Sequence, residues 1–211
     1  MGRAANTTWN PSDKSANISL SAGDLTASAT SVTDGAVRST TSKTGGKIYF
    51  EVDAASTGFG GNTGIGLALG STGLSSIGSS GVGVIVYGGG LIYVNGGFAL
   101  SLGLPLTGIV SLAVDLVNSR FWVRLNALPP PNNTWNNTGA DPAANTGGVN
   151  IASMFPTNPA FAVSTFNETL TSFNARFGGE GFSYAVPAGF SGWDALSVPV
   201  VGAGALSLGI N

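Results

Sequence analysis

Apolar and polar residues alternate with a period of two along most of the chain. In residues 47–54 the positions 48, 50 and 52 are apolar, and the positions between them hold Tyr49, Glu51 and Asp53. Side chains of an extended strand point alternately to its two faces, so this segment is predicted to be a half-buried strand, with one face in the core and the other toward solvent. Helical periodicity is almost absent.

Turn residues divide the alternating pattern into many short strands. The spacing predicts strands in 18–29 (two strands around a Gly23-Asp24 turn), 64–69, 82–87, 91–94, 108–127 (two strands around an Asn118-Ser119 turn), 160–164 and 170–177. Gly88, Gly89 and Gly90 separate two of these strands, and glycine reaches positive φ without steric cost, so a β-hairpin is expected there. Residues 128–149 are polar and rich in Asn and Pro, and they predict one long loop.

Many short strands without crossover helices predict an all-β protein, either an antiparallel sandwich or a barrel. No internal repeat or domain boundary interrupts the pattern, and a chain of 211 residues fits one sandwich domain. We therefore expect a single domain over residues 1–195. It is followed by an apolar, strand-like segment over 196–211, which either extends the domain or serves as an assembly arm.

Composition removes several classes of function. The chain has no histidine and no cysteine, so it lacks the commonest general base and metal ligand as well as thiolate chemistry. Only 9% of residues are charged, the formal net charge is −2, and the basic residues form no stripe that could follow phosphates. The longest apolar run is interrupted by glycine and is too short to cross a bilayer. We expect no catalytic residues, no cofactor, no metal, no nucleic-acid partner and no membrane insertion.

Several ordered motifs resemble the SPRY family. They are RSTTSKTGGKIYFEV (38–52), GIGLA (64–68), VSLAVDLVNSRFWVRLNA (110–127), PAFAVS (159–164) and LTSFNARFG (170–178). The segments TWNPSDKSANISLSAGDLTA (8–27), ADPAANTGG (140–148) and YAVPAGFSGWDA (184–195) are similar to SPRY-like modules of bacteriophage and prophage proteins. The chain departs from the family pattern at Asn126-Ala127, where Asn-Gly is usual, and in its long following loop.

The resemblance implies a two-sheet antiparallel β-sandwich of the concanavalin-like kind and a binding module that is not an enzyme. We expect a structural protein of a bacteriophage or prophage virion, such as a head fibre, a decoration protein or a tail-associated module. Its partners would be other virion proteins, copies of itself and a host-surface glycan. The alternative is a secreted, lectin-like carbohydrate-binding module.

Glu51 and Asp53 are the acids nearest to a known catalytic pattern. Retaining β-glucanases of similar sandwich fold carry a further acid on the same strand, with the two working carboxylates about 5–5.5 Å apart. Here the positions for that acid hold Ala55 and Ser56. The sequence therefore favours a structural Glu51, expected to pair with Arg38, over a glycoside hydrolase.

Two aspartates and two tryptophans also have competing interpretations. Asp141 and Asp194 lie in predicted loops, where they either bind Ca²⁺ or cap turns. The lack of an Asp-rich cluster favours turns, because Ca²⁺ takes six to eight oxygen ligands. Trp9 and Trp193 stand at the two ends of the resemblance and are interpreted as structural residues that close the sandwich.

Trp135 lies among asparagines in the long loop. An indole flanked by amides is a common sugar-binding arrangement, because the ring packs on a pyranose face while the amides bond its hydroxyls. The favoured alternative is that Trp135 caps the sandwich or packs on a neighbouring subunit. Tyr87 and Tyr93 flank the glycine turn and either reach the same rim or brace the hairpin. The candidate ligand-binding residues are Trp135, Asn132, Asn133, Asn136, Tyr87 and Tyr93.

The C-terminal segment is the clearest assembly signal. It is apolar, alternating and free of charge, and an exposed segment of this kind is prone to pair with other strands. We expect it to pair with its own sheet or, by slight preference, with a partner chain. The candidate assembly residues are Val198, Val200, Val201, Leu206 and Leu208.

Overall fold

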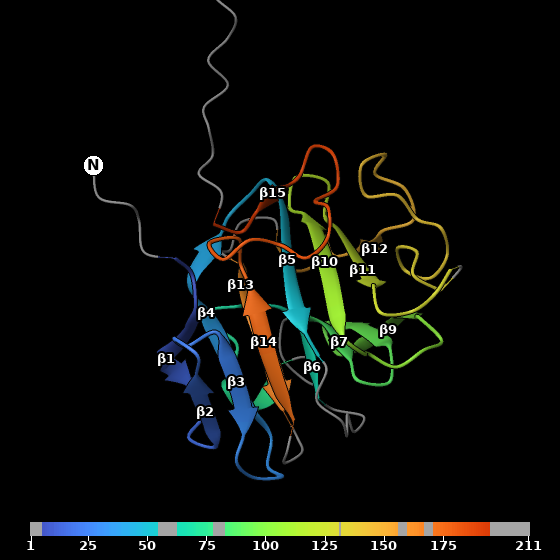
Figure 1. Cartoon of the computed structure of the whole chain (residues 1–211). Helices are drawn as coiled ribbons and strands as arrows, with labels where there is room; N and C mark the ends of the chain where they lie inside the picture. The colour runs from blue at the N-terminus through green and yellow to red at the C-terminus, as the bar shows by residue number, and fades with distance from the viewer. Residues whose placement is uncertain are drawn as a thin grey trace, which may run out of the picture.

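Two β-sheets packed face to face make up the protein (Figure 1). The computed structural model describes residues 6–54, 63–77, 83–130, 132–155, 160–166 and 171–194. One sheet has the strand order β1 (Trp9–Lys14), β4 (Gly35–Lys43), β13 (Ala160–Phe166), β6 (Gly64–Leu69), β7 (Gly83–Tyr87), β8 (Leu91–Val94) and β9 (Gly97–Ser101). The other has the order β12 (Val149–Asn150), β11 (Arg120–Leu125), β10 (Ile109–Asp115), β5 (Lys47–Asp53), β14 (Ser172–Arg176), β3 (Thr26–Ala29) and β2 (Ile18–Ser21).

Two short elements complete the arrangement. The strand β15 (Ser191–Gly192) pairs with β5 in parallel, whereas the neighbouring strands of both sheets pair antiparallel. A single turn of 3-10 helix, η1 (Leu74–Ser76), follows β6. The predicted antiparallel sandwich is confirmed, and the barrel alternative is wrong because each sheet ends in edge strands instead of closing on itself.

The predicted hairpins are present. The strands β2 and β3 pair around the Gly23-Asp24 turn, and β7 and β8 pair across the three glycines. The strands β10 and β11 pair from Val110↔Leu125 to Asp115↔Arg120. Their turn is held by Asp115 Oδ1, which accepts hydrogen bonds from the backbone N–H groups of Val117 and Asn118.

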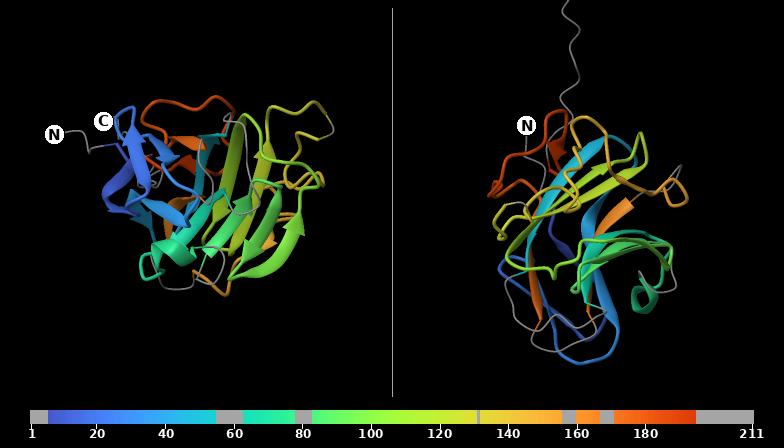
Figure 2. Two further views of the ribbon diagram at one scale, coloured as in Figure 1. Left: turned by 90° about the horizontal axis from the view of Figure 1, so that it is seen from below. Right: turned by 90° about the vertical axis from the view of Figure 1, so that its right-hand side faces the viewer.

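The main core lies between the two layers (Figure 2). Alternate side chains of the central strands fill it, including Phe50 and Val52 of β5, Leu112 of β10 and Leu67 of β6. Burial of such side chains contributes about 1.5–3 kcal/mol each relative to exposure. The alternation therefore stabilises the fold in the way the sequence pattern predicts.

The outer face of β5 is covered, and the prediction that β5 is half-buried is wrong. Tyr49 and Glu51 are both 0% exposed, although they point away from the main core. The cover is the segment 179–194, which brings Phe182 edge-on to the Tyr49 ring at 4.9 Å and adds β15 alongside β5. An alternating pattern shows that a strand has two different faces, but it does not show what lies above the more polar one.

The two ends of the described chain meet at one side of the sandwich. Trp9 and Trp193 are 0% exposed, and both rings pack against Phe177. The Trp193 indole N–H donates to Thr41 Oγ1 at 2.9 Å, and the Thr7 backbone N–H donates to the Asp194 carboxylate. The prediction that both tryptophans close the sandwich is confirmed.

The predicted boundary at residue 195 and the extension 196–211 lie outside the described residues. Within the described residues, no helix has the length and apolar character needed to span a membrane.

Candidate binding surface

The long loop after β11 folds back over the outer face of its own sheet. Trp122 and Arg124 alternate with core residues of β11 and point outward under this loop. Trp122 is 0% exposed under the loop. Its indole N–H donates to the Thr146 carbonyl at 2.8 Å, and Phe190 packs edge-on to its ring. Gly148 lies so close to the indole that an added Cβ would stand 2.6 Å from its ring atoms.

Asn136 ties the loop to β11. Its backbone N–H donates to the Val123 carbonyl at 2.7 Å, and its side-chain Oδ1 accepts the Val123 N–H at 2.9 Å. Its Nδ2 donates to the Gly147 carbonyl at 2.8 Å. Asn136 is 0% exposed. The prediction that its amide binds a ligand is wrong, because both polar atoms are already bonded inside the loop.

Arg124 contacts two aromatic rings, and we call Arg124, Trp135 and Tyr184 the Arg124 cluster. The guanidinium carbon is 5.4 Å from the Trp135 ring centroid and 5.6 Å from that of Tyr184. The Arg124 Nε donates to Asn126 Oδ1. All three side chains of the cluster are half-buried, so each keeps part of its surface in solvent.

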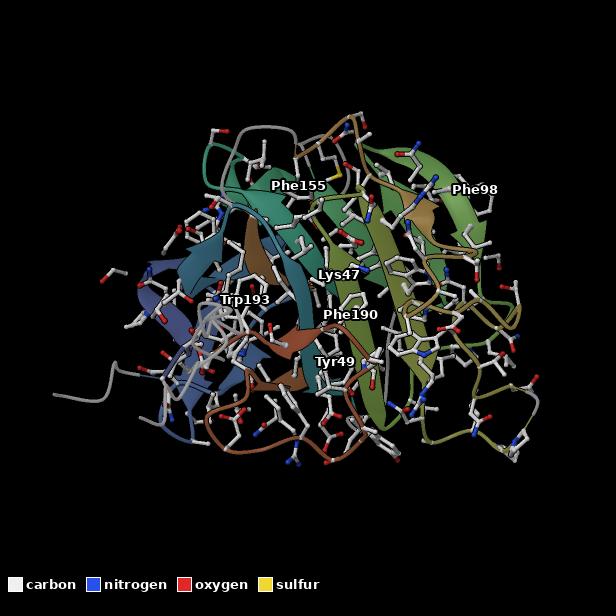
Figure 3. All side chains as sticks on the ribbon, turned by 90° about the horizontal axis from the view of Figure 1, so that it is seen from above. Lys47, Tyr49, Phe98, Phe155, Phe190 and Trp193 are labelled. Atoms are coloured by element: carbon white, nitrogen blue, oxygen red, sulfur yellow. The ribbon has the colours of Figure 1, made fainter. Side chains whose placement is uncertain are left out.

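A buried network holds Tyr184 in place. Glu51 Oε2 accepts the Ser183 N–H and Oε1 accepts the Tyr184 N–H, both at 2.8 Å. The Tyr49 hydroxyl donates to Glu51 Oε1 at 2.7 Å and accepts from Ser111, whose Oγ in turn accepts from Asn126 Nδ2. Figure 3 shows Lys47 and Tyr49 of β5 next to Phe190, which belongs to the covering segment 179–194.

The electrostatics of the network follow from burial. Removal from water raises the pKa of the Tyr49 hydroxyl well above its ordinary value, and the neighbouring Glu51 carboxylate raises it further. Tyr49 therefore stays protonated and keeps donating to Glu51. The network links the strand β5 to the cluster through Asn126 on one side and Tyr184 on the other.

Known structures share this arrangement of strands. The SPRY domain of human HERC1 matches with a TM-score of 0.58 at 11% identity, over 79% of this chain and 96% of that one. The PSpry domain of TRIM65 matches with a TM-score of 0.54 at 15% identity, over 82% of this chain and 92% of that one. Stonustoxin matches with a TM-score of 0.54 at 14% identity, over 82% of this chain and 27% of that one.

The chain has a SPRY-like fold. The likeness covers most of the chain and nearly the whole of two SPRY domains, and at these identities it concerns the fold alone. A scan of protein-family models and a search of curated proteins find no match to the sequence.

The SPRY-like sandwich separates Glu51 from Arg38. Arg38 belongs to β4 in the other sheet, where it forms an ion pair with Asp13 at 2.8 Å and donates to the Thr72 carbonyl. The predicted pairing of Glu51 with Arg38 is wrong. Both Glu51 oxygens accept hydrogen bonds within the protein, and Glu51 is 0% exposed.

The two loop aspartates of the SPRY-like sandwich serve local structure. Asp141 Oδ1 accepts the Ala143 N–H at 2.8 Å, as in an Asx turn, and Asp194 binds the Thr7 N–H. Across the described ranges, no three acidic residues gather in a group that could hold a metal ion.

The tyrosine candidates lie apart from Trp135. Tyr87 and Tyr93 contact each other at 5.6 Å between ring centroids and belong to a small apolar cluster with Ile85 and Val163, separate from the main core. That cluster covers the outer face of the seven-stranded sheet, whereas Trp135 lies over the outer face of the other sheet. The two tyrosines brace the hairpin and do not share a rim with Trp135.

Asn132 and Asn133 remain half-buried in the loop near Trp135. The assembly candidates at 198, 200, 201, 206 and 208 lie outside the described residues. Sequence reasoning missed Tyr184 and the contact of Arg124 with Trp135. The alternation put Arg124 on the outer face, but nothing in the sequence indicated that residue 184 returns to it, because that contact depends on the buried Glu51.

Proposed function

We propose that this chain is a non-enzymatic binding module that docks onto another protein through the Arg124 cluster. The observation that carries the proposal is a guanidinium in cation–π contact with both a Trp and a Tyr ring, with all three side chains half-exposed. Arg, Trp and Tyr are the residue types most enriched among the contacts that dominate binding energy at protein interfaces.

Preorganisation supports the proposal. Asn136 fixes the loop that carries Trp135, and Glu51 fixes the segment that carries Tyr184. Side chains that are already held in place lose little conformational freedom on binding, which favours affinity. Arg124 forms no ion pair within the described ranges, so its outer N–H groups suit a carboxylate or carbonyl group of the partner.

A non-enzymatic role fits the acids of the sandwich. The Glu51 carboxylate is buried and engaged by three donors, so it is not placed to attack or protonate a substrate. The sequence supplies no histidine or cysteine as a substitute.

A more specific proposal is that the partner is another protein of a bacteriophage or prophage virion. Its support is the likeness of residues 8–27, 140–148 and 184–195 to phage SPRY-like modules and the low proportion of charge, 9% of residues. The test is quantitative mass spectrometry of purified particles made by a lysogen that carries the gene. We expect the chain at a fixed copy number per particle. Its absence from particles, while it is abundant in the same cells, would contradict the virion assignment.

Carbohydrate binding is the second candidate, favoured by the half-exposed Trp135 beside Asn132 and Asn133. Arg124 occupies one face of the ring, so a sugar would have to use the other face. A glycan array read with the wild-type chain and with Trp135→Ala tests this role. Binding that disappears in Trp135→Ala would support it, and an array without any bound glycan would remove it.

A further inference from the structure

Among the described residues the two sheets end in four edge strands, β1, β9, β12 and β2, and three of them carry features that discourage pairing with another chain. The strand β1 contains Pro11, Asp13 and Lys14. Lys14 Nζ also donates to the Ile18 carbonyl on the neighbouring edge strand β2 at 2.7 Å. The strand β12 has only two residues. Proline, charge and shortness are the usual protections of sheet edges.

The fourth edge strand, β9, lacks these protections. Its sequence GFALS has no charge and no proline, and within the described residues it pairs only with β8. Phe98 is 62% exposed and rests against Tyr93, with 6.0 Å between the ring centroids. Figure 3 shows Phe98 at the margin of the molecule, away from Trp193. An uncharged and exposed edge is a template for an added strand.

A groove runs beside this edge. Its volume is about 480 Å³, and it separates β9 from the β12 edge of the other sheet. Residues of β8 and β9 line it on one side, and residues of β11, β12 and the loop before β12 line it on the other, among them Val94, Leu100, Arg120, Gly148, Val149 and Asn150. Val94 and Leu100 also pack against the main core, so they offer apolar contacts to a strand laid along β9.

We propose that β9 accepts residues 196–210 of a second copy of this chain as an added strand. Residues 195–211 contain no charged side chain, and their alternating apolar pattern matches the uncharged edge. Main-chain hydrogen bonds would supply affinity, and alternate side chains would enter the groove, as in other cases of strand addition.

The position of the chain's exit favours a second copy over the chain's own segment. The described chain ends at Asp194, which binds Thr7 next to β1, and β9 is the opposite edge of the same seven-stranded sheet. Figures 1 and 2 show β1 and β9 on opposite sides of the molecule. Six strand spacings of about 4.8 Å place them about 29 Å apart, so a chain that folded back would use more than half of the segment in crossing.

This contact is independent of the Arg124 cluster and of the virion assignment. The donor segment and the acceptor edge are different surfaces, so each copy can give one strand and receive one. A head-to-tail contact of this kind produces a closed ring or an open filament, according to the rotation between neighbouring copies.

Cysteine cross-linking tests the contact, because the chain contains no cysteine of its own. Full-length Phe98→Cys and Leu206→Cys chains are mixed and treated with a short bismaleimide. We expect a cross-linked dimer in the mixture, and much less in either variant alone. A mixture of Val32→Cys with Leu206→Cys is the control, since Val32 is 67% exposed and lies between β3 and β4.

Three results would overturn the inference. They are no cross-link in the mixture, an equal cross-link with Val32→Cys, and a cross-link confined to single chains of the double variant Phe98→Cys/Leu206→Cys. The last result would mean that the segment pairs with its own sheet. If the chain is present in particles but one of these results is obtained, the proposed function is still supported and only this inference is contradicted.

Self-association gives a second, independent readout. Phe98→Lys places a charge on the edge, and we expect it to weaken association in sedimentation velocity by about tenfold, as expected for a change near 1.4 kcal/mol. Val32→Lys is the matched control and should leave association unchanged. Association that is equal in wild type and Phe98→Lys, or a wild type that stays monomeric at all concentrations, would contradict the proposal.

Discussion

Single polar residues determine where the loops of this sandwich lie. Asn136 forms the hydrogen bonds with the Val123 backbone that a neighbouring strand would otherwise form. Glu51 accepts hydrogen bonds from three donors in two segments of the chain. A buried polar group stabilises only when its partners are present, because an unpaired one costs about 1–3 kcal/mol. These residues therefore give the loop surface its fixed shape.

Asn136→Ala should lower the free energy of unfolding by about 2–3 kcal/mol, because it leaves the Val123 N–H and the Gly147 carbonyl without their side-chain partner. Urea unfolding measures the change. Asn133→Ala is the matched control, and we expect a change within about 0.5 kcal/mol there. Equal effects of the two substitutions would contradict the role given to Asn136.

Asp115 should make stability depend on pH in the acidic range. Burial by itself raises the pKa of Asp115, but hydrogen bonds from Asn118 and Val117, together with Lys47, outweigh it and hold the pKa below its ordinary value. A carboxylate with a lowered folded pKa stabilises the protein above its unfolded pKa, about 3.9, and this contribution is lost as pH falls through the folded pKa.

Asp115→Asn should therefore have a lower free energy of unfolding than wild type at pH 7. The difference between the two should shrink as pH falls below about 4. Urea unfolding at a series of pH values gives the comparison, with Glu180→Gln as a control at an exposed acid. A difference in unfolding free energy that stays constant down to the lowest pH would show that the charge of Asp115 does not contribute to stability.

At the scale of elements, the strands could be predicted from the sequence, but the segments that pack over their outer faces could not. Alternation located the β2–β3, β7–β8 and β10–β11 hairpins because period-two patterns are local. The cover of β5 by segment 179–194 depends on contacts between residues 132 or more positions apart in sequence, which no local pattern contains. For the same reason Trp135 was a visible candidate, whereas its neighbours in the cluster were not.

Glu51→Gln should loosen the segment 179–194. The amide offers one acceptor where the carboxylate offers two, so one of the Ser183 or Tyr184 N–H groups would face an NH2 group. We expect a loss of about 1–3 kcal/mol in urea unfolding and faster hydrogen exchange at residues 183 and 184. Unchanged exchange in Glu51→Gln would be evidence against this anchoring.

Gly148→Ala should disturb the long loop, since the new Cβ would lie 2.6 Å from the Trp122 ring. We expect a destabilisation of about 1–3 kcal/mol, the usual cost of forcing an extra methyl group into packed surroundings. Gly89→Ala is the control, because nothing lies within 4 Å of a Cβ built there. The midpoint temperatures of thermal unfolding of the two variants are compared. Equal midpoints would mean that the loop does not pack on Trp122 as described.

At the scale of the whole molecule, the two surfaces that we propose for binding lie on different sheets of the SPRY-like sandwich. The Arg124 cluster lies on the outer face of one sheet, and the β9 edge with Phe98 ends the other. We propose the first as the docking site for a partner protein and the second as the contact between copies of the chain. Two surfaces of this kind suit a protein that binds a partner while it also joins copies of itself.

The most direct test of the central claim is the copy number of variant chains in purified particles, measured by quantitative mass spectrometry. Trp135→Ala and Arg124→Ala should each reduce incorporation by about tenfold or more, as expected when a dominant interface residue is truncated. Val117→Ala, at a 72% exposed position in the β10–β11 turn, should be incorporated normally. Normal incorporation of folded Trp135→Ala and Arg124→Ala chains would contradict the claim that the Arg124 cluster is the docking surface.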